Sequence, residues 1–298
     1  MGIKKEFGIF DFINYTVFTL ITLVCVIPFY YIFINTISDP MEVTKGNVIF
    51  LPKGIQFLNY TNILRNPDIW HAVYISVART VIGTLITVFC SAFFGYILSK
   101  KEMYYRKLIY RLVVITMFFN AGLIPWFITM KLLHLNDNFL LYILPSAIIP
   151  FYLILFKTYI EEAIHPSIEE SAFIDGAGYY TIFTKIIFPL SMPIVATIAV
   201  FTSVGQWNSF QDTLFLVRDE RLITLQMLLY QYMQQVDAIA NAIKTSGVGR
   251  AAQTGGYQIT PTAVRMTISM IVILPILIVY PMLQRYFVKG IMVGAIKG

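Results

Sequence analysis

The stretch Glu170-Ser171-Ala172-Phe173-Ile174-Asp175-Gly176-Ala177 is a polar break between two long apolar segments. Just before it, Pro166 fixes the entry to a helix, and Ser167 and Glu170 have the S-x-x-E spacing of a capping box. Gly176 is suited to the positive φ of a turn that ends such a helix. The stretch therefore predicts a short helix that stops at Gly176.

A second short helix is predicted directly downstream. Its apolar residues recur at helical spacing, so they lie on one face. Two prolines in Pro189-Leu190-Ser191-Met192-Pro193 are expected to stop this helix before the next apolar run. The face consists of Tyr179, Ile182, Phe183, Ile186, Ile187 and Leu190.

The composition indicates a membrane protein. Of 298 residues, 57% are hydrophobic and 13% are charged, and the mean hydropathy is +0.71. Apolar runs of about 20 residues are typical of membrane-spanning helices. We predict an all-α, polytopic fold in which residues 1–298 form a single transmembrane domain. The first run is too long for a cleaved signal, and no small-residue cleavage site follows it. The six predicted spans are 12–36, 71–98, 108–130, 139–160, 192–217 and 263–287.

Basic residues in short loops give the predicted orientation. The dense cluster of Lys and Arg between Lys100 and Arg111 favours the cytoplasmic side. Both termini and the polar segment 161–191 are then cytoplasmic, and loops 37–70 and 218–261 lie outside. The net charge of +6 fits this orientation. A basic patch interleaved with exposed aromatic residues, as in nucleic-acid binding, is absent from the sequence.

Catalytic and metal-binding patterns are missing from the sequence. Cys25 and Cys90 both lie in predicted spans, which disfavours a structural disulfide. His71, His134 and His165 are far apart and have no metal-ligand spacing. The sequence has no G-x-x-x-x-G-K-[ST] phosphate loop, so we expect neither ATP hydrolysis by P-loop chemistry nor a cofactor in this chain.

The polar segment resembles the cytoplasmic EAA loop of binding-protein-dependent ABC importer permeases, in which E-A-A-x-x-D-G-A precedes P-L-x-x-P. Ser171 stands in place of the first alanine. In that family the short helix sits in a cleft of the ATPase, and an amphipathic connector on the membrane is the alternative. The resemblance implies ATPase-coupling roles for Glu170, Ser171, Ala172, Asp175, Gly176 and Ala177.

The resemblance extends along the chain. Four further stretches are similar to the maltose-type (MalG-like) carbohydrate permeases, and the chain looks closest to their LplC-like subfamily. This implies a second homologous permease, a cytoplasmic ABC ATPase dimer that binds ATP and Mg²⁺, and an extracytoplasmic solute-binding protein in a bacterial plasma membrane. The stretches are Gly95-Tyr96-Ile97-Leu98-Ser99-Lys100, Phe118-Phe119-Asn120-Ala121-Gly122-Leu123-Ile124-Pro125, Gln206-Trp207-Asn208-Ser209-Phe210 and the tail from Lys289 to Gly298.

Polar residues inside predicted spans are candidates for a substrate path, because lipid offers no hydrogen bonds. Aromatic faces stack on sugar rings, and amides bond to hydroxyls. The alternatives are that Trp207 is an interface anchor, that Asn208 bonds between helices and that Arg79 snorkels outward or pairs with a carbonyl. The candidates are Trp207, Asn208, Gln206, Gln211, Asn120, Trp126 and Arg79, with Asp212 close to the first four.

The loop 218–261 is unusually long, and its glycine-rich part from Ser246 to Tyr257 is predicted to be flexible. In maltose-type permeases a loop at this place can probe the binding protein, and a disordered connector is the alternative.

These features together predict a permease subunit, not an enzyme, of an ATP-driven importer for oligosaccharides or related glycans. An ion-coupled secondary transporter is a rival, but it would normally carry carboxylates in span centres or inverted repeats. A membrane-embedded enzyme would need convergent His, Asp and Glu side chains.

Overall fold

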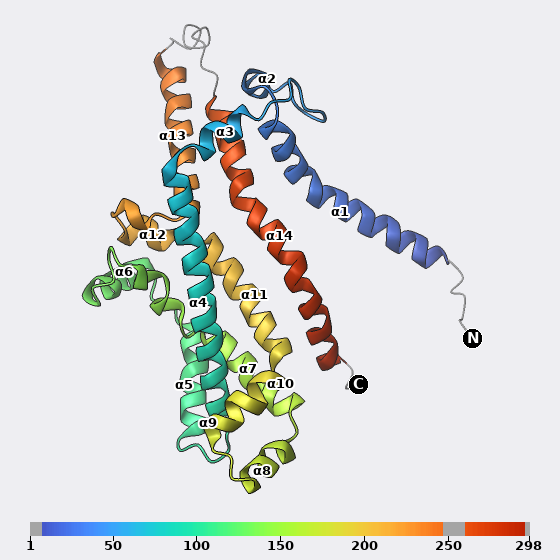
Figure 1. Ribbon diagram of the computed structural model, residues 1–298, viewed down its shortest axis with the longest axis vertical. Helices are drawn as coiled ribbons and strands as arrows, with labels where there is room; N and C mark the ends of the chain where they lie inside the picture. Colours follow the sequence, from blue (N-terminus) through green and yellow to red (C-terminus); the bar gives the residue numbers. More distant parts are fainter. Residues whose placement is uncertain (1–7, 247–259, 296–298) are drawn as a thin grey trace. The chain divides into compact units, whose positions relative to one another are not determined.

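The computed structural model describes residues 8–246 and 260–295, and every regular element in these ranges is helical (Figure 1). The longer helices are α1 (Ile9–Thr36), α4 (Pro67–Ser99), α5 (Arg106–Phe118), α6 (Leu123–Leu132), α7 (Pro150–Ala163), α8 (Pro166–Ile174), α11 (Met192–Asn208), α13 (Leu225–Ser246) and α14 (Pro261–Ala295). The shorter ones are α2 (Pro40–Thr44), α3 (Leu58–Leu64), η1 (Phe139–Tyr142), η2 (Leu144–Ser146), α9 (Tyr179–Ile182), η3 (Phe183–Ile187), α10 (Phe188–Leu190), α12 (Gln211–Leu216) and η4 (Glu220–Leu222).

The chain divides into two compact units. The first comprises residues 1–67 and 229–274, and the second comprises residues 68–228 and 275–298. In the first unit, α1 is apolar along its length, yet its buried residues are confined to Ile34, Asn35 and Thr36. Ile34 packs with Val43 and Val48 in a small cluster. Asn59 ties α3 to this end of α1, because its Nδ2 donates to the Thr36 carbonyl at 3.2 Å.

The second unit is built along α4, and two hydrophobic clusters lie toward its two ends. Ile75 in the first half of α4 packs with residues of α6, η1 and α12, and Tyr96 near its C-terminal end packs with residues of α7, α9 and α11. With 33 residues, α4 is about 50 Å long at ~1.5 Å per residue. It therefore connects two parts of this unit that are remote from each other.

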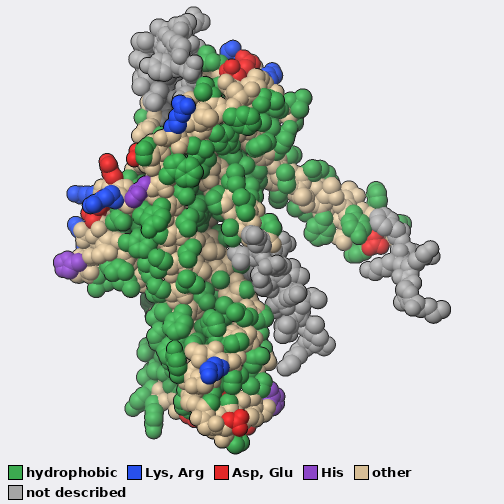
Figure 2. All heavy atoms as spheres, viewed as in Figure 1, with side chains coloured by type: hydrophobic (Ala, Val, Ile, Leu, Met, Phe, Trp, Pro, Cys, Tyr) green, Lys and Arg blue, Asp and Glu red, His purple; other side chains and the backbone are tan. Residues whose placement is uncertain are grey.

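Polar and charged side chains form contacts near the start of α4. Near the start of α4, the His71 ring bonds to the Arg221 carbonyl at 2.7 Å. Arg218 and Asp219 lie just before Arg221 in the sequence, and their backbone N–H groups donate to the Asp137 carboxylate at 2.5 Å and 2.9 Å. These bonds lower the pKa of the Asp137 carboxyl. Figure 2 shows that hydrophobic side chains dominate the visible surface along α4 and α5.

Three predicted spans are not continuous helices. The span 108–130 breaks between α5 and α6, which are bent by 120°. Gly122 has a φ of +82° there, and the Asn120 side chain accepts from its N–H at 2.9 Å, a local turn that competes with the helix. The span 139–160 bends by 46° ahead of Pro150, because the proline has no N–H to continue a helix.

The predicted span 192–217 also needs correction at its end. The helix stops at Asn208, Ser209 is extended, and α12 begins at Gln211. The preceding helical run Tyr179–Leu190 meets α11 at 78°. Among the residues that the structure describes, three helices are each long and apolar enough to span a membrane, and the three bent pairs would add three more if each is one span. Six spans therefore stay a prediction.

The region 218–261 is not simply a long loop. It contains η4 and the 22-residue helix α13. The stretch predicted to be flexible begins at Ser246, the last residue of α13, and its remainder up to residue 257 lies outside the described residues.

Candidate functional site

The short helix α8 carries three of the six predicted coupling residues, Glu170, Ser171 and Ala172, and the other three follow its end. The helix begins earlier in the sequence than the capping box at Ser167 predicts. Pro166 occupies its first turn as expected, but the N-cap is His165 and not Ser167. The His165 Nδ1 accepts from the Ser167 backbone N–H at 3.3 Å and lies 2.8 Å from the Ser167 hydroxyl. Because Pro166 has the φ of a helix and needs no hydrogen-bond partner, it makes position 165 the boundary.

The C-terminal end of α8 is closed at Gly176, as the sequence predicts. Gly176 has a φ of +80°. Its N–H bonds to the Phe173 carbonyl at 3.0 Å, and the Ala177 N–H bonds to the Ala172 carbonyl at 2.9 Å. This pair of bonds is a Schellman motif, which closes a helix through a residue in the left-handed region. Nothing lies within 4 Å of a Cβ built on Gly176, so its backbone conformation alone demands glycine.

The predicted coupling residues divide by exposure. Ala172 is buried and belongs to the cluster around Tyr96 and Phe183, which holds α8 on the rest of its unit. Ala177 is half-buried. The remaining four, Glu170, Ser171, Asp175 and Gly176, are exposed. The helix therefore presents a mixed carboxylate and small-residue face, and the apolar Ile174 beside it is 86% exposed.

The second predicted helix continues past Pro189. After α9, the segment Phe183–Ile187 forms one wider π-type turn, in which the Phe188 N–H bonds back to the Phe183 carbonyl. Pro189 lies inside α10, and the bend comes at Ser191. A widened turn just ahead of a proline relieves its clash with the preceding turn. Of the predicted face, Ile182, Phe183 and Ile187 are buried and Ile186 is half-buried, but Tyr179 and Leu190 are exposed.

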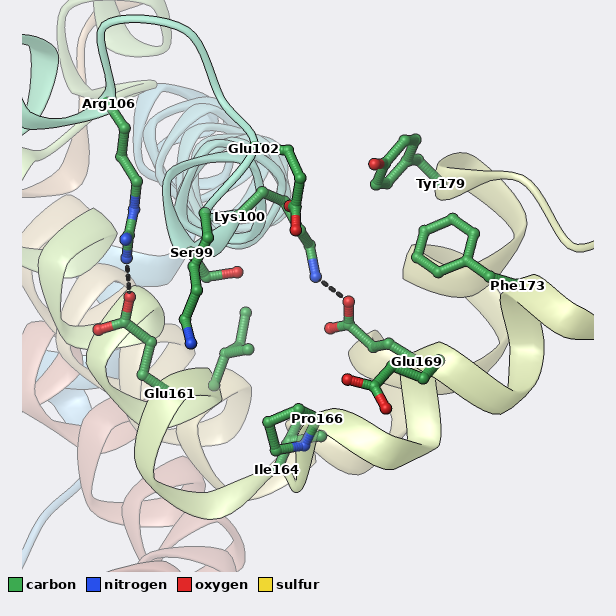
Figure 3. A pocket seen from close by; sticks show the side chains of 13 residues that line it. Ser99, Lys100, Glu102, Arg106, Glu161, Ile164, Pro166, Glu169, Phe173 and Tyr179 are labelled. Atoms are coloured by element: carbon green, nitrogen blue, oxygen red, sulfur yellow. Dashed lines mark hydrogen bonds and ion pairs between the residues drawn. The ribbon is translucent and has the colours of Figure 1, made fainter.

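Ion pairs surround a pocket between α8 and the ends of α4, α5 and α7 (Figure 3). Lys100, just past the end of α4, pairs with Glu169 on α8. Arg106 on α5 pairs with Glu161 on α7. The cavity has a volume of about 670 Å³. Figure 3 also shows the rings of Phe173 and Tyr179 beside each other, in an edge-to-face arrangement with centroids 4.9 Å apart.

A second, smaller cavity lies against the buried guanidinium of Arg79. This side chain is 3% exposed and forms an ion pair with Asp212 at 2.6 Å. It also donates to the Gln206 Oε1 at 3.2 Å from two nitrogens and to the Ser209 carbonyl at 3.2 Å, and it stacks 4.3 Å from the centre of the Tyr142 ring. Arg79 therefore neither snorkels outward nor pairs with a carbonyl alone.

Gln206 extends this network. Its Nε2 donates to the Ser146 hydroxyl at 2.6 Å and to the Tyr142 carbonyl at 3.1 Å. Gly83 on α4 makes room for it, since a Cβ there would lie 2.7 Å from the Gln206 Nε2. The cavity beside the network has a volume of about 210 Å³, and Trp126 and Tyr152 also border it.

The structure brings three of the seven predicted path residues together. Arg79, Gln206 and Trp126 border the same cavity. The other four lie elsewhere. Trp207 borders a separate apolar groove between α4, α11 and α14, Asn208 is exposed and accepts from the Gln226 Nε2 at 3.1 Å, and Asn120 and Gln211 are exposed.

Several contacts in these two sites are not predicted from the sequence. Asp212 is not among the predicted path residues, although it is the carboxylate partner of Arg79. The signal was present, because a carboxylate and a guanidinium inside two predicted spans need a partner. The sequence does not predict the ion pair between Lys100 and Glu169, because nothing in their spacing indicates the contact. Within the described residues, no group of three or more His, Cys, Asp and Glu side chains is placed to hold a metal ion.

Residues 88–293 match the family described as "Binding-protein-dependent transport system inner membrane component". The chain belongs to this family. The binding-protein-dependent permease is 34% identical to the polygalacturonan/rhamnogalacturonan transport system permease protein YtcP of Bacillus subtilis, over 97% of this chain and 99% of YtcP. It is 32% identical to Protein LplC of the same organism, over 99% of this chain and 97% of LplC.

A solved structure shows the same fold. The permease is similar, with a TM-score of 0.82 and 30% identity, to a chain in the crystal structure of a bacterial ABC transporter involved in the import of the acidic polysaccharide alginate. The match covers 96% of this chain and 99% of that chain. The protein is therefore the permease subunit of an ABC importer and not an enzyme, and in its family ATP hydrolysis belongs to a separate subunit. The ion-coupled transporter and the membrane enzyme are not favoured.

Proposed function

We propose that this permease imports oligosaccharides or related glycans. Its relatives are named for transport of polygalacturonan, rhamnogalacturonan and alginate. The cavity beside Gln206 combines aromatic side chains, such as Trp126 and Tyr152, with hydrogen-bonding groups. Aromatic faces supply apolar contact with a sugar ring, and polar groups bond to its hydroxyls.

A second, homologous permease subunit would complete the path. The cavity of about 210 Å³ is smaller than the roughly 300–1,000 Å³ typical of small-molecule sites. An oligosaccharide therefore needs walls from another subunit. An extracytoplasmic binding protein would deliver the glycan, and an ATPase dimer would bind ATP with Mg²⁺ on the cytoplasmic side.

The observation that carries the coupling proposal is the exposed helix α8, which is closed at Gly176 and anchored through Ala172. Residues 170–177 would dock on the ATPase, with residues 161–191 and both termini in the cytoplasm. Closure of the ATPase on ATP would favour one of two arrangements of the transmembrane helices, and release would favour the other. This exchange gives alternating access.

The coupling proposal is tested by a substitution that strains the backbone at Gly176 but contacts no neighbouring atoms. Gly176→Val places a β-branched residue at a φ of +80°, which costs ~1 kcal/mol or more. Gly178→Val is the matched control, because Gly178 has an extended backbone with a φ of −80°, and a Cβ there also has nothing within 4 Å. The intact transporter is purified through a tag on this chain, and its ATP hydrolysis is measured with and without loaded binding protein.

We expect Gly176→Val to insert in the membrane but to lose stimulation of ATP hydrolysis by the loaded binding protein, while Gly178→Val keeps it. Normal stimulation in Gly176→Val would show that residues 170–177 do not couple this subunit to an ATPase.

A further inference from the structure

The end of α4 carries the stretch Gly95-Tyr96-Ile97-Leu98-Ser99-Lys100, and three of these residues each contact a different element. Gly95 lies against α7. A Cβ on Gly95 would be 3.0 Å from the Leu153 carbonyl oxygen and 3.2 Å from the Lys157 backbone nitrogen. Since these are backbone atoms and cannot rotate away, glycine allows α4 to approach α7 at this point.

Tyr96 contacts the segment that follows α8. It is 2% exposed, and the centre of its ring lies 5.4 Å from that of Phe183. Phe183 is itself 1% exposed and belongs to the same cluster as Ala172 of α8. The aromatic contact therefore packs α4 against the chain on the C-terminal side of α8.

Lys100 contacts α8 directly. Its ammonium pairs with the Glu169 carboxylate and lies 4.0 Å from the centre of the Tyr96 ring. The side chains of Lys100 and Glu169 are only 14% and 15% exposed. Water and salt screen such a pair less than a pair on the open surface.

Glu169 and Glu170 are neighbours with different surroundings. Successive residues on a helix point about 100° apart. Glu169 turns toward Lys100, and Glu170 is exposed. One carboxylate thus holds α8 on its own subunit, while the next remains available to a partner.

We infer that Lys100 is a positioning residue for transport, because it holds α8 on α4 through Glu169 and so transmits displacement of α8 to α4. The inference rests on the proposed docking of residues 170–177 on an ATPase. Because α4 is a continuous 33-residue helix whose other half carries Arg79, movement of its end is passed to the buried network beside the cavity.

A charge exchange tests this inference in the intact transporter. The variants are Lys100→Glu, Glu169→Lys and the double variant that carries both. Binding-protein-stimulated ATP hydrolysis and the number of glycans imported per ATP are measured, with co-purification of the ATPase as the check on assembly. We expect each single variant to lower stimulation about tenfold, within the range for residues along a coupling route, and the double variant to restore most of it.

A neighbouring carboxylate is the matched control. Glu161 borders the same pocket and pairs with Arg106 and Lys157, but neither partner is on α8. Glu169→Gln is therefore expected to lower the import per ATP, whereas Glu161→Gln is expected to keep it. If Glu169 only stabilises the fold, Glu169→Gln would lower both assembly and ATP hydrolysis without changing the number of glycans imported per ATP. That result would overturn the inference.

Two further outcomes would also overturn it. Single variants that keep normal stimulation would show that the pair transmits nothing, and single variants that the charge exchange does not restore would show that the two residues act separately. If Gly176→Val uncouples hydrolysis while Lys100→Glu does not, only the role of Lys100 is wrong. If neither variant uncouples hydrolysis, the proposed docking of residues 170–177 is wrong.

Discussion

At the residue scale, Arg79 illustrates how a charge is accommodated inside a membrane protein. Its guanidinium bonds to the Asp212 carboxylate, the Gln206 amide oxygen and the Ser209 carbonyl, which all belong to the chain itself. A guanidinium engaged in this way is already neutralised by its partner. We therefore assign Arg79 to holding α4, α11 and α12 together at the cavity, and we propose that its neighbours such as Trp126 contact the substrate.

Breaking this ion pair should destabilise the permease strongly. Asp212→Leu or Arg79→Met leaves one charge in a site that is almost closed to water, and loss of one partner of a buried pair costs about 3–5 kcal/mol. The double variant Arg79→Met/Asp212→Leu removes both charges, so it should recover much of the loss. The measurement is the midpoint of thermal unfolding in detergent. A loss of stability in the double variant that equals the sum of the two single losses would contradict the pairing.

At the element scale, glycines in two helices have opposite surroundings. Gly95 of α4 lies against the backbone of α7, with a built Cβ 3.0 Å from the Leu153 oxygen, while Gly205 of α11 has nothing within 4 Å of its Cβ. Both positions are helical, where alanine is favoured over glycine by roughly 0.8–1.0 kcal/mol. Packing therefore decides which glycine the fold requires.

Gly95→Ala should lower the thermal midpoint, because the added methyl group pushes α4 from α7 at a cost of about 1–3 kcal/mol that exceeds the gain in helix propensity. Gly205→Ala should leave the midpoint unchanged or raise it. Detergent-solubilised variants are compared in the same scan. A stabilised Gly95→Ala variant would show that α7 moves aside at little cost.

At the scale of the whole molecule, the continuous helix α4 separates two sets of polar contacts within one unit. His71 contacts the Arg221 carbonyl near its start, and Lys100 contacts Glu169 just past its end. These positions are about 40 Å apart along the helix at ~1.5 Å per residue, more than the ~30 Å of a bilayer core. The two sets should therefore lie on opposite sides of the membrane.

Thiol labelling tests this topology. Cysteines are placed at the exposed positions Lys101 and Glu220 in a variant without Cys25 and Cys90. In intact cells, an impermeant thiol reagent should label position 220 and spare position 101, and permeabilised cells should show both. Labelling of position 101 alone in intact cells would invert the predicted orientation and remove residues 170–177 from contact with a cytoplasmic ATPase.

The sequence by itself determined the membrane class, the approximate apolar segments and the helix stop at Gly176, because hydropathy and backbone preference are local properties. It also indicated the family through ordered stretches along the chain. The tertiary structure alone decided the partner of Arg79, the separation of Trp207 from Gln206 and the contact of Lys100 with Glu169. These depend on which helices approach one another and on rotations of about 100° between adjacent side chains, which local patterns do not specify.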